Sequence, residues 1–153
     1  MTQRVIAVNL LRDSRVFVHT YTETVDGFRI IDGLPRVLGG IGDSIAVGDA
    51  VVAALRASNR RPLPSRNLRI HPPDRDLLQW LGLRSYGQFM RGVRSVQLIA
   101  DFDEEIGDIT VSPLRNGGKE GFMTIQGGAF TLSFDSPEQL GRAVQQAMGK
   151  ATP

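Results

Sequence analysis

Residues 135–148 have the sequence DSPEQLGRAVQQAM, which predicts the helix that organises the C-terminal half of the chain. Ser136 is a favoured N-cap residue, Pro137 suits the first helical position, and Gln139 stands three residues after the cap, as in a capping box. The apolar side chains that follow share the spacing of one helix face: Leu140, Ala143, Val144, Ala147 and Met148. We therefore predict a helix that packs one face against a core.

An earlier stretch, residues 43–55 with the sequence DSIAVGDAVVAAL, repeats part of this pattern. Its Gly48-x-Ala50-Val51-x-x-Ala54-Leu55 matches Gly141-x-Ala143-Val144-x-x-Ala147-Met148. This helix is apolar almost all round, so we expect it to lie deeper. A glycine inside a helix costs about 1 kcal/mol relative to alanine, and we interpret both glycines as points of close packing against a sheet. The match indicates either an internal pseudo-repeat or a chance likeness between two helices rich in alanine and valine.

The length and composition are those of one globular domain. A chain of 153 residues with 41% hydrophobic and 22% charged residues can bury a sizeable core. The absence of cysteine excludes disulfides and thiolate chemistry. No apolar run of about 18 residues is present, and the first residues lack the features of a secretory signal. We expect a single domain over residues 1–153 with a cytoplasmic location.

The charge is small in total but unevenly distributed. The formal net charge of +2 does not by itself indicate a nucleic-acid-binding protein. Residues 56–94 contain nine arginines and two acids, whereas residues 101–108, DFDEEIGD, contain five acids and no base. We therefore expect a molecule with one basic and one acidic region.

Strands account for most of the remaining chain. The best example is residues 93–102, where Val96, Leu98, Ala100 and Phe102 alternate with Ser95, Gln97 and Asp101. Short helices are expected to start near Pro72 and Ser85. Turns at Asp26-Gly27, residues 103–108 and Gly127-Gly128 are too short for crossovers, so consecutive strands should pair antiparallel. The expected strands are residues 5–11, 16–21, 22–25, 28–31, 93–102, 109–112, 122–126 and 130–134. We predict an α+β domain with a largely antiparallel sheet and helices packed mainly on one face.

No residue pattern marks a catalytic, metal or cofactor site. His19 and His71 lack a metal-ligand spacing, and the acidic residues 101–108 lack the glycine-containing EF-hand pattern. The glycines before residue 43 match neither phosphate-binding motif, so we interpret them as a flexible loop. We predict that the protein is not an enzyme and binds no metal or cofactor.

One short block has an enzymatic counterpart. Gly42-Asp43-Ser44-Ile45 resembles the nucleophile block of GDSL-type hydrolases, in which the serine attacks an ester. Those enzymes place the block directly after the first strand and carry D-x-x-H near the C-terminus, whereas no histidine follows His71 here. We therefore favour Ser44 as a helix N-cap over an esterase nucleophile.

The C-terminal third also resembles a family of binding proteins, the CdiI immunity proteins of bacterial contact-dependent growth inhibition (CDI) systems. In the N-terminal half, the pattern from Val47 to Leu55 followed by Ser58 also fits. The C-terminal motifs are Phe89-Met90-x-x-Val93 with Val96-x-Leu98, Ile109-Thr110-Val111-Ser112-Pro113-Leu114-Arg115, Gly118-x-x-Gly121-Phe122, and Asp135-Ser136-Pro137-Glu138-x-Leu140-Gly141-x-Ala143-Val144. These stretches cover about half of the chain in the family's order.

The resemblance implies a non-enzymatic protein that neutralises a toxin. Its partner would be the C-terminal toxin domain of a CDI effector, commonly a nuclease, bound in the cytoplasm of the producing cell. Because a nuclease groove is basic, an acidic patch can steer association and mimic phosphate. We therefore predict a toxin-binding surface made of Asp101, Asp103, Glu104, Glu105 and Asp108. The alternative binding face consists of Arg60, Arg61, Arg66 and Arg69.

A second hypothesis is a small nucleic-acid-binding module that uses the basic stretch 56–94, because arginine pairs with phosphate. Its aromatic residues Trp80, Tyr86 and Phe89 are sparse and stand at helical positions, which favours core packing over base stacking. Direct nucleic-acid binding is therefore the less favoured function. The identity of the toxin and the oligomeric state stay open at the level of sequence.

Overall fold

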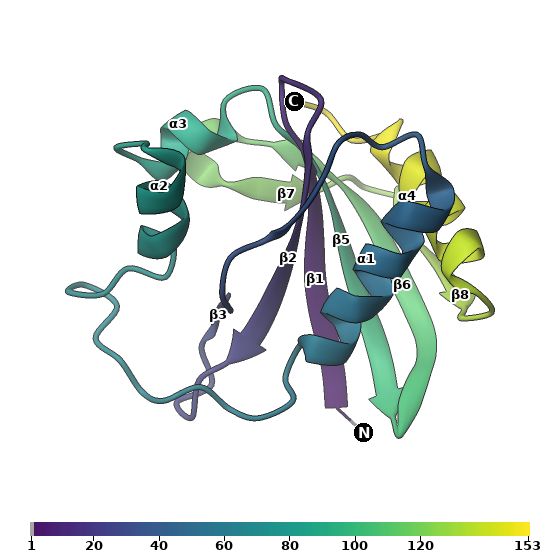
Figure 1. The fold of residues 1–153 in the computed structure, drawn as a ribbon, viewed down its shortest axis with the longest axis horizontal. Helices are drawn as coiled ribbons and strands as arrows, with labels where there is room; N and C mark the ends of the chain where they lie inside the picture. The colour runs from purple at the N-terminus through teal and green to yellow at the C-terminus, as the bar shows by residue number, and fades with distance from the viewer. Residues whose placement is uncertain (1) are drawn as a thin grey trace.

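The computed structural model describes residues 2–153, in which eight strands form one curled antiparallel sheet accompanied by four α-helices (Figure 1). This architecture confirms the predicted α+β class. In chain order the elements are β1 (Thr2–Leu10), β2 (Val16–Glu23), β3 (Arg29–Ile31), β4 (Arg36–Leu38), α1 (Ser44–Ala57), α2 (Arg75–Leu81), α3 (Tyr86–Met90), β5 (Arg94–Asp103), β6 (Glu105–Asn116), the 3₁₀ helix η1 (Gly118–Glu120), β7 (Phe122–Thr124), β8 (Phe130–Ser133) and α4 (Pro137–Met148).

The sheet consists of two units with the same topology. In the first, β1 pairs with β2, and β2 then carries β3 at its C-terminal end and β4 at its N-terminal end. In the second, β5 pairs with β6, and β6 carries β7 toward its C-terminal end and β8 nearer its N-terminal end. Each unit closes with a long helix, α1 or α4, and the units join through the β1–β5 pair. The pseudo-repeat is therefore a ββββα unit that occurs twice, with α2 and α3 inserted between the copies.

The repeated glycines pack the two long helices against each other. A Cβ added at Gly48 would overlap the backbone carbonyl of Pro137, and one added at Gly141 would overlap that of Ser44. Each glycine is the fifth residue of its helix and meets the first residue of the other helix. The prediction that these glycines pack against the sheet is wrong, because α1 and α4 lie side by side on one face and need backbone contact to do so (Figure 1).

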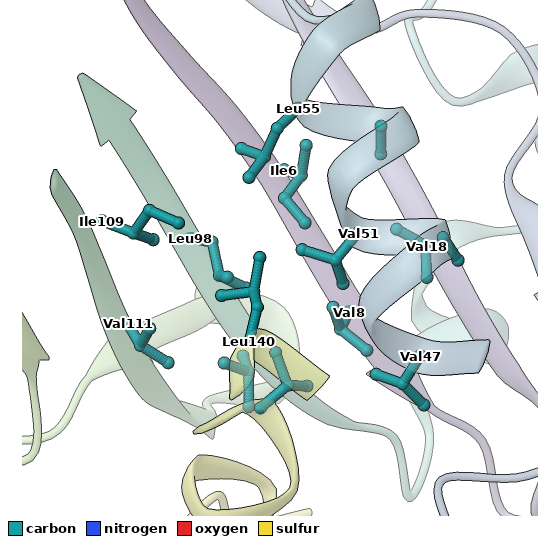
Figure 2. Close-up of a cluster of buried hydrophobic side chains, with 14 of the residues drawn as sticks. Ile6, Val8, Val18, Val47, Val51, Leu55, Leu98, Ile109, Val111 and Leu140 are labelled. Carbon is teal, nitrogen blue, oxygen red and sulfur yellow. The ribbon is translucent and has the colours of Figure 1, made fainter. Parts of the chain in front are cut away.

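The main core lies between these two helices and the sheet (Figure 2). Val51 and Leu55 of α1, together with Leu140 of α4, lie over Ile6 of β1 and Leu98 of β5, and all five side chains are fully buried. A smaller cluster lies on the opposite face, where α2 and α3 cover one end of the sheet; it consists of Phe17, Leu77, Phe89 and Met90. The two long helices thus pack on one face, as predicted, whereas the two short helices cover part of the second face.

The N-cap of α1 differs from the predicted one, whereas the N-cap of α4 agrees with it. Asp43, not Ser44, caps α1, because Asp43 Oδ1 accepts hydrogen bonds from the backbone N–H groups of Ile45 and Ala46 at 3.1 and 3.0 Å. Ser44 is instead the first residue of the helix. For α4 the predicted cap is confirmed, since the N–H of Gln139 donates to Ser136 Oγ at 3.2 Å.

Two predicted turns are also corrected. Residues 103–108 do not form a loop: β5 and β6 pair as far as Asp103 and Glu105, and Glu104 alone makes the turn with φ at 61°. Gly127-Gly128 does not join a hairpin, because β7 and β8 both pair with β6 and not with each other. In the acidic segment, strand pairing overrides the local preference of charged residues for a loop. Gly127-Gly128 does form a turn, in which the N–H of Gly128 donates to the carbonyl of Ile125 at 3.0 Å, but the strands on either side of it both pair with β6.

A buried serine ties the end of α1 to the sheet. Ser58 is fully buried; its Oγ accepts a hydrogen bond from the N–H of Val5 at 2.9 Å and donates one to the carbonyl of Tyr21 at 2.6 Å. We expect Ser58→Ala to lower the free energy of unfolding by about 1–3 kcal/mol, because two buried backbone groups lose their partner. Urea denaturation measures the loss. Ser44→Ala is the control, since Asp43 already caps that helix, and an equal loss in both variants would contradict the role of Ser58.

Candidate functional site

The acidic residues gather at the tip of the β5–β6 hairpin, at the end of the sheet where β1 begins (Figure 1). Asp101 and Asp103 belong to β5, Glu105 and Asp108 belong to β6, and Glu104 forms the turn between them. The side chain of Asp101 is half-buried and the other four are exposed. The hairpin therefore places all five predicted residues in one region, and we call these residues the acidic hairpin.

Two members of the acidic hairpin have partners within the protein. Arg56, at the end of α1, donates to Glu105 Oε1 at 3.1 Å, and this hydrogen bond lowers the pKa of Glu105. Asp108 Oδ1 accepts a hydrogen bond from Ser133 Oγ at 2.9 Å. Within residues 2–153, Asp101, Asp103 and Glu104 form no ion pair. These three carboxylates, and Asp108 whose serine partner is uncharged, keep their charge available to a partner.

The alternative arginine face lies on the long connector between α1 and α2. Arg60, Arg61, Arg66 and Arg69 are all exposed. The connector runs alongside the β2–β3 turn, because Leu63 exchanges backbone hydrogen bonds with Glu23 and Val25. The side chain of Arg66 stabilises the connector itself, because its guanidinium donates hydrogen bonds to the backbone carbonyls of His71 and Pro72. Since Arg56 pairs with Glu105, the basic stretch and the acidic hairpin meet at one end of the sheet.

The aromatic residues of the basic stretch belong to the second core. Phe89 is buried and stacks on Phe17 with ring centroids 6.1 Å apart, and Tyr86 packs against Phe89 at 5.6 Å. Trp80 is 47% exposed, yet its ring lies 5.7 Å from that of Phe17. Aromatic rings that pack against one another in a core do not form an open platform on which bases can stack, and this weakens the nucleic-acid hypothesis.

The structure places neither histidine in a site with other ligands. His19 is buried on β2, and neither of its ring nitrogens has a hydrogen-bond partner among residues 2–153, whereas His71 is exposed on the connector. Among the residues from 2 to 153, no three His, Asp or Glu side chains are arranged to hold a metal ion. No helix in the same part of the chain has both the length and the apolar character needed to cross a bilayer.

The structure gives two further residues an environment that their neighbours in the sequence do not predict. Arg56 belongs to the basic stretch in the sequence, but in the structure it pairs with Glu105 of the acidic hairpin. Asn9 is buried, and its Oδ1 has no hydrogen-bond partner within the described residues. A signal for Asn9 was present, since it is the single polar side chain in a strand, residues 5–11, that is otherwise apolar on both faces.

Comparison with known proteins finds a likeness in fold but no match in sequence. No protein-family model matches this chain, and no curated protein sequence matches it. A chain of the CdiA-CT/CdiI toxin and immunity complex from Yersinia pseudotuberculosis, however, superposes with a TM-score of 0.71 at 17% identity, over 99% of each chain. This chain has a CdiI-like fold. The resemblance predicted from short motifs is therefore confirmed at the level of the fold.

A second solved structure shares this architecture. It is a protein of unknown function from Neisseria meningitidis, with a TM-score of 0.74 at 18% identity, and the match covers 98% of this chain and 96% of the other. Coverage of this extent means that the likeness extends over both ββββα units and the inserted α2 and α3 of this chain. At such low identities the likeness is one of backbone arrangement and assigns no role to individual residues.

Proposed function

We propose that this protein is an immunity protein that binds and neutralises the C-terminal toxin domain of a CDI effector in the cytoplasm of the producing cell. The observation that carries the proposal is the full-length match to a chain from a toxin and immunity complex. Such a function needs a stable scaffold and a specific surface, and it requires no catalytic group. We further propose that the toxin is a nuclease.

The acidic hairpin is the proposed toxin-binding surface. Four of its side chains are exposed, and Asp101, Asp103 and Glu104 are not engaged in ion pairs within the described residues. A nuclease must attract phosphate, so its groove is positively charged and is complementary to a cluster of carboxylates. Complementary charge raises the rate of association and favours one orientation of the partner.

Growth rescue tests the proposal directly. The toxin domain encoded immediately upstream of this gene is expressed in cells with and without the protein. We expect growth only when both are present, together with a complex that co-purifies from the rescued cells. Growth arrest in the presence of the folded protein would overturn the immunity function.

Charge reversal tests the surface. Because Glu105 is already paired with Arg56, the double variant Asp103→Lys/Glu104→Lys removes the two exposed, unpaired carboxylates of the hairpin tip. We expect the association rate with the toxin to fall at least tenfold at low salt, and the difference from wild type to shrink as salt is added. Stopped-flow or surface-based kinetics measures both.

The matched control is Asp49→Lys/Glu120→Lys, which changes the net charge by the same amount at exposed positions outside the hairpin. An association rate in the hairpin variant equal to that of this control would show that the hairpin is not the toxin-binding surface. In that case the alternative face is tested with Arg60→Glu/Arg61→Glu, whose arginines are exposed on the connector.

A further inference from the structure

A pocket lies at the end of the sheet opposite the acidic hairpin. The turn between β1 and β2 and the segment of residues 81–93 line a volume of about 220 Å³, which we call the turn pocket. In the β1–β5 pair, Leu10 is the partner of Arg94 and Thr2 is the partner of Phe102, so this turn and the acidic hairpin lie at opposite ends of the same strands (Figure 1). Neither of the proposed toxin-binding surfaces includes the turn pocket.

Both walls of the turn pocket are fixed by contacts within the protein. The N–H of Leu11 donates to the carbonyl of Arg15 at 2.9 Å, and the N–H of Ser14 donates to the carbonyl of Leu11 at 3.0 Å, so the β1–β2 turn is closed by backbone hydrogen bonds. On the other side, Phe89 of α3 is buried and stacks on Phe17. Because both walls are formed before a ligand binds, binding loses little conformational entropy.

The charged residues that line the turn pocket leave two arginines uncompensated. Among the described residues that line it, Asp13 is the one acid, and Arg15 engages both of its oxygens. The backbone N–H of Arg15 donates to Asp13 Oδ1 at 3.1 Å, and Arg15 Nε donates to Asp13 Oδ2 at 2.9 Å. Arg12 and Arg91 are exposed, and neither forms an ion pair within residues 2–153. Their guanidinium groups are therefore available to an anion from solution.

Gly92 holds Arg12 at the turn pocket. A Cβ added at Gly92 would overlap Cγ and Cδ of Arg12, so the aliphatic part of this arginine lies directly on the backbone between α3 and β5. The φ angle of Gly92 is 71°, a conformation that favours glycine, and the absent side chain leaves the space that Arg12 fills. Because Arg91 directly precedes Gly92, this contact brings the two uncompensated arginines to one pocket, although they are far apart in the sequence.

The uncharged lining residues determine what can accompany the anion. Gln88 Oε1 accepts a hydrogen bond from the backbone N–H of Arg84 at 2.7 Å, which leaves the side-chain amide of Gln88 as a donor. A cavity of about 150 Å³ accepts one benzene ring, so a volume of about 220 Å³ has room for a ring and one charged group. The other uncharged residues of the lining are apolar: Leu11, Leu81, Leu83, Phe89 and Val93.

We propose that the turn pocket binds a small anion with an apolar body. A carboxylate or phosphate of this ligand pairs with Arg12 and Arg91, and an apolar group about the size of one ring lies against the leucines and Phe89. Guanidinium groups bind carboxylate and phosphate alike, because both anions present oxygens that match the forked donors of arginine. The apolar side chains add affinity that a bare inorganic ion cannot obtain. The site is independent of the proposed immunity function, since its ligand is not the toxin.

Titration of the full chain, followed by NMR, tests the site. Phenyl phosphate and phenylacetate are the probes, and the backbone amide resonances of Arg12, Gln88 and Gly92 report binding. We expect saturable shifts with a dissociation constant of about 1 mM or tighter for at least one probe, and the tighter probe identifies the preferred anion. Inorganic phosphate lacks the apolar body and benzyl alcohol lacks the charge, so each should bind at least about fivefold more weakly. Absence of saturable shifts with both probes, or equal affinity for either of the two partial ligands, would overturn the proposal.

Charge variants locate the binding site on the protein. Arg12→Gln/Arg91→Gln removes the two uncompensated charges, while glutamine keeps carbon atoms at the Cγ and Cδ positions that contact Gly92. We expect the probe to bind this variant at least about tenfold more weakly than wild type. The matched control, Arg60→Gln/Arg61→Gln, removes the same charge at exposed positions that do not line the turn pocket, and its affinity should stay within about twofold of wild type. Equal affinities of the two variants for the probe would overturn the site. The titrations contain no toxin, so a failure of the immunity function leaves their outcome unchanged.

Discussion

Gly48→Ala is expected to lower the free energy of unfolding by about 3 kcal/mol or more. The new Cβ would overlap the carbonyl oxygen of Pro137 and would lie 3.1 Å from Pro137 Cα. These are backbone atoms of the first turn of α4, so no side chain can rotate away and the helices must separate. Alanine would otherwise favour the helix by about 1 kcal/mol, which is too little to offset the loss of packing between α1 and α4.

Urea denaturation followed by circular dichroism measures this effect. Gly42→Ala is the control, because no atom lies within 4 Å of a Cβ at Gly42 and its backbone needs no glycine. Gly141→Ala should resemble Gly48→Ala, since its Cβ would overlap the carbonyl of Ser44. The double variant should lose less than the sum, because one separation of the helices relieves both overlaps. A Gly48→Ala protein as stable as wild type would contradict the close crossing.

Acidification is expected to destabilise the protein through His19. The ring is 1% exposed, packs edge-on against Phe17 and Phe89, and has no partner for either nitrogen within the described residues. Burial lowers the pKa of His19 to about 4, whereas an unfolded histidine titrates near 6.5. Between these values the unfolded chain binds a proton that the folded protein does not. The free energy of unfolding therefore falls as pH drops from about 6.5 to about 4, by about 3 kcal/mol in total.

His19→Phe should abolish this part of the acid sensitivity. Phenylalanine fits an aromatic cluster and brings no ring nitrogen, so the variant should lose less stability than wild type between pH 7.5 and pH 4. His71→Phe changes an exposed histidine and serves as the control. Urea denaturation at both pH values measures the difference, to which the carboxylates common to all three proteins contribute equally. If His19→Phe loses as much stability as wild type, protonation of His19 is not the cause.

The proposed binding surface shows how much of such a site the order of residues predicts. The acidic residues form a run of charge in the sequence, and they lie at one exposed tip because a single hairpin carries all of them. Which of them remain unpaired depends on Arg56, which lies 49 residues away from Glu105 in the chain. The pairing of β1 with β5, which are far apart in the sequence, brings Asn9 beside Ser95. No local pattern encodes such a pairing.

The sequence by itself determined the elements whose causes are local. The cap and periodicity of residues 137–148 predicted α4, the Asp26-Gly27 turn predicted the β2–β3 hairpin, and the short turns predicted an antiparallel sheet. Tertiary structure alone decided that Gly48 and Gly141 join helix to helix, and that the acidic turn is one residue long. The physical reason is that caps and turns depend on neighbouring residues, whereas helix crossings, strand partners and buried polar groups depend on segments that only folding brings together.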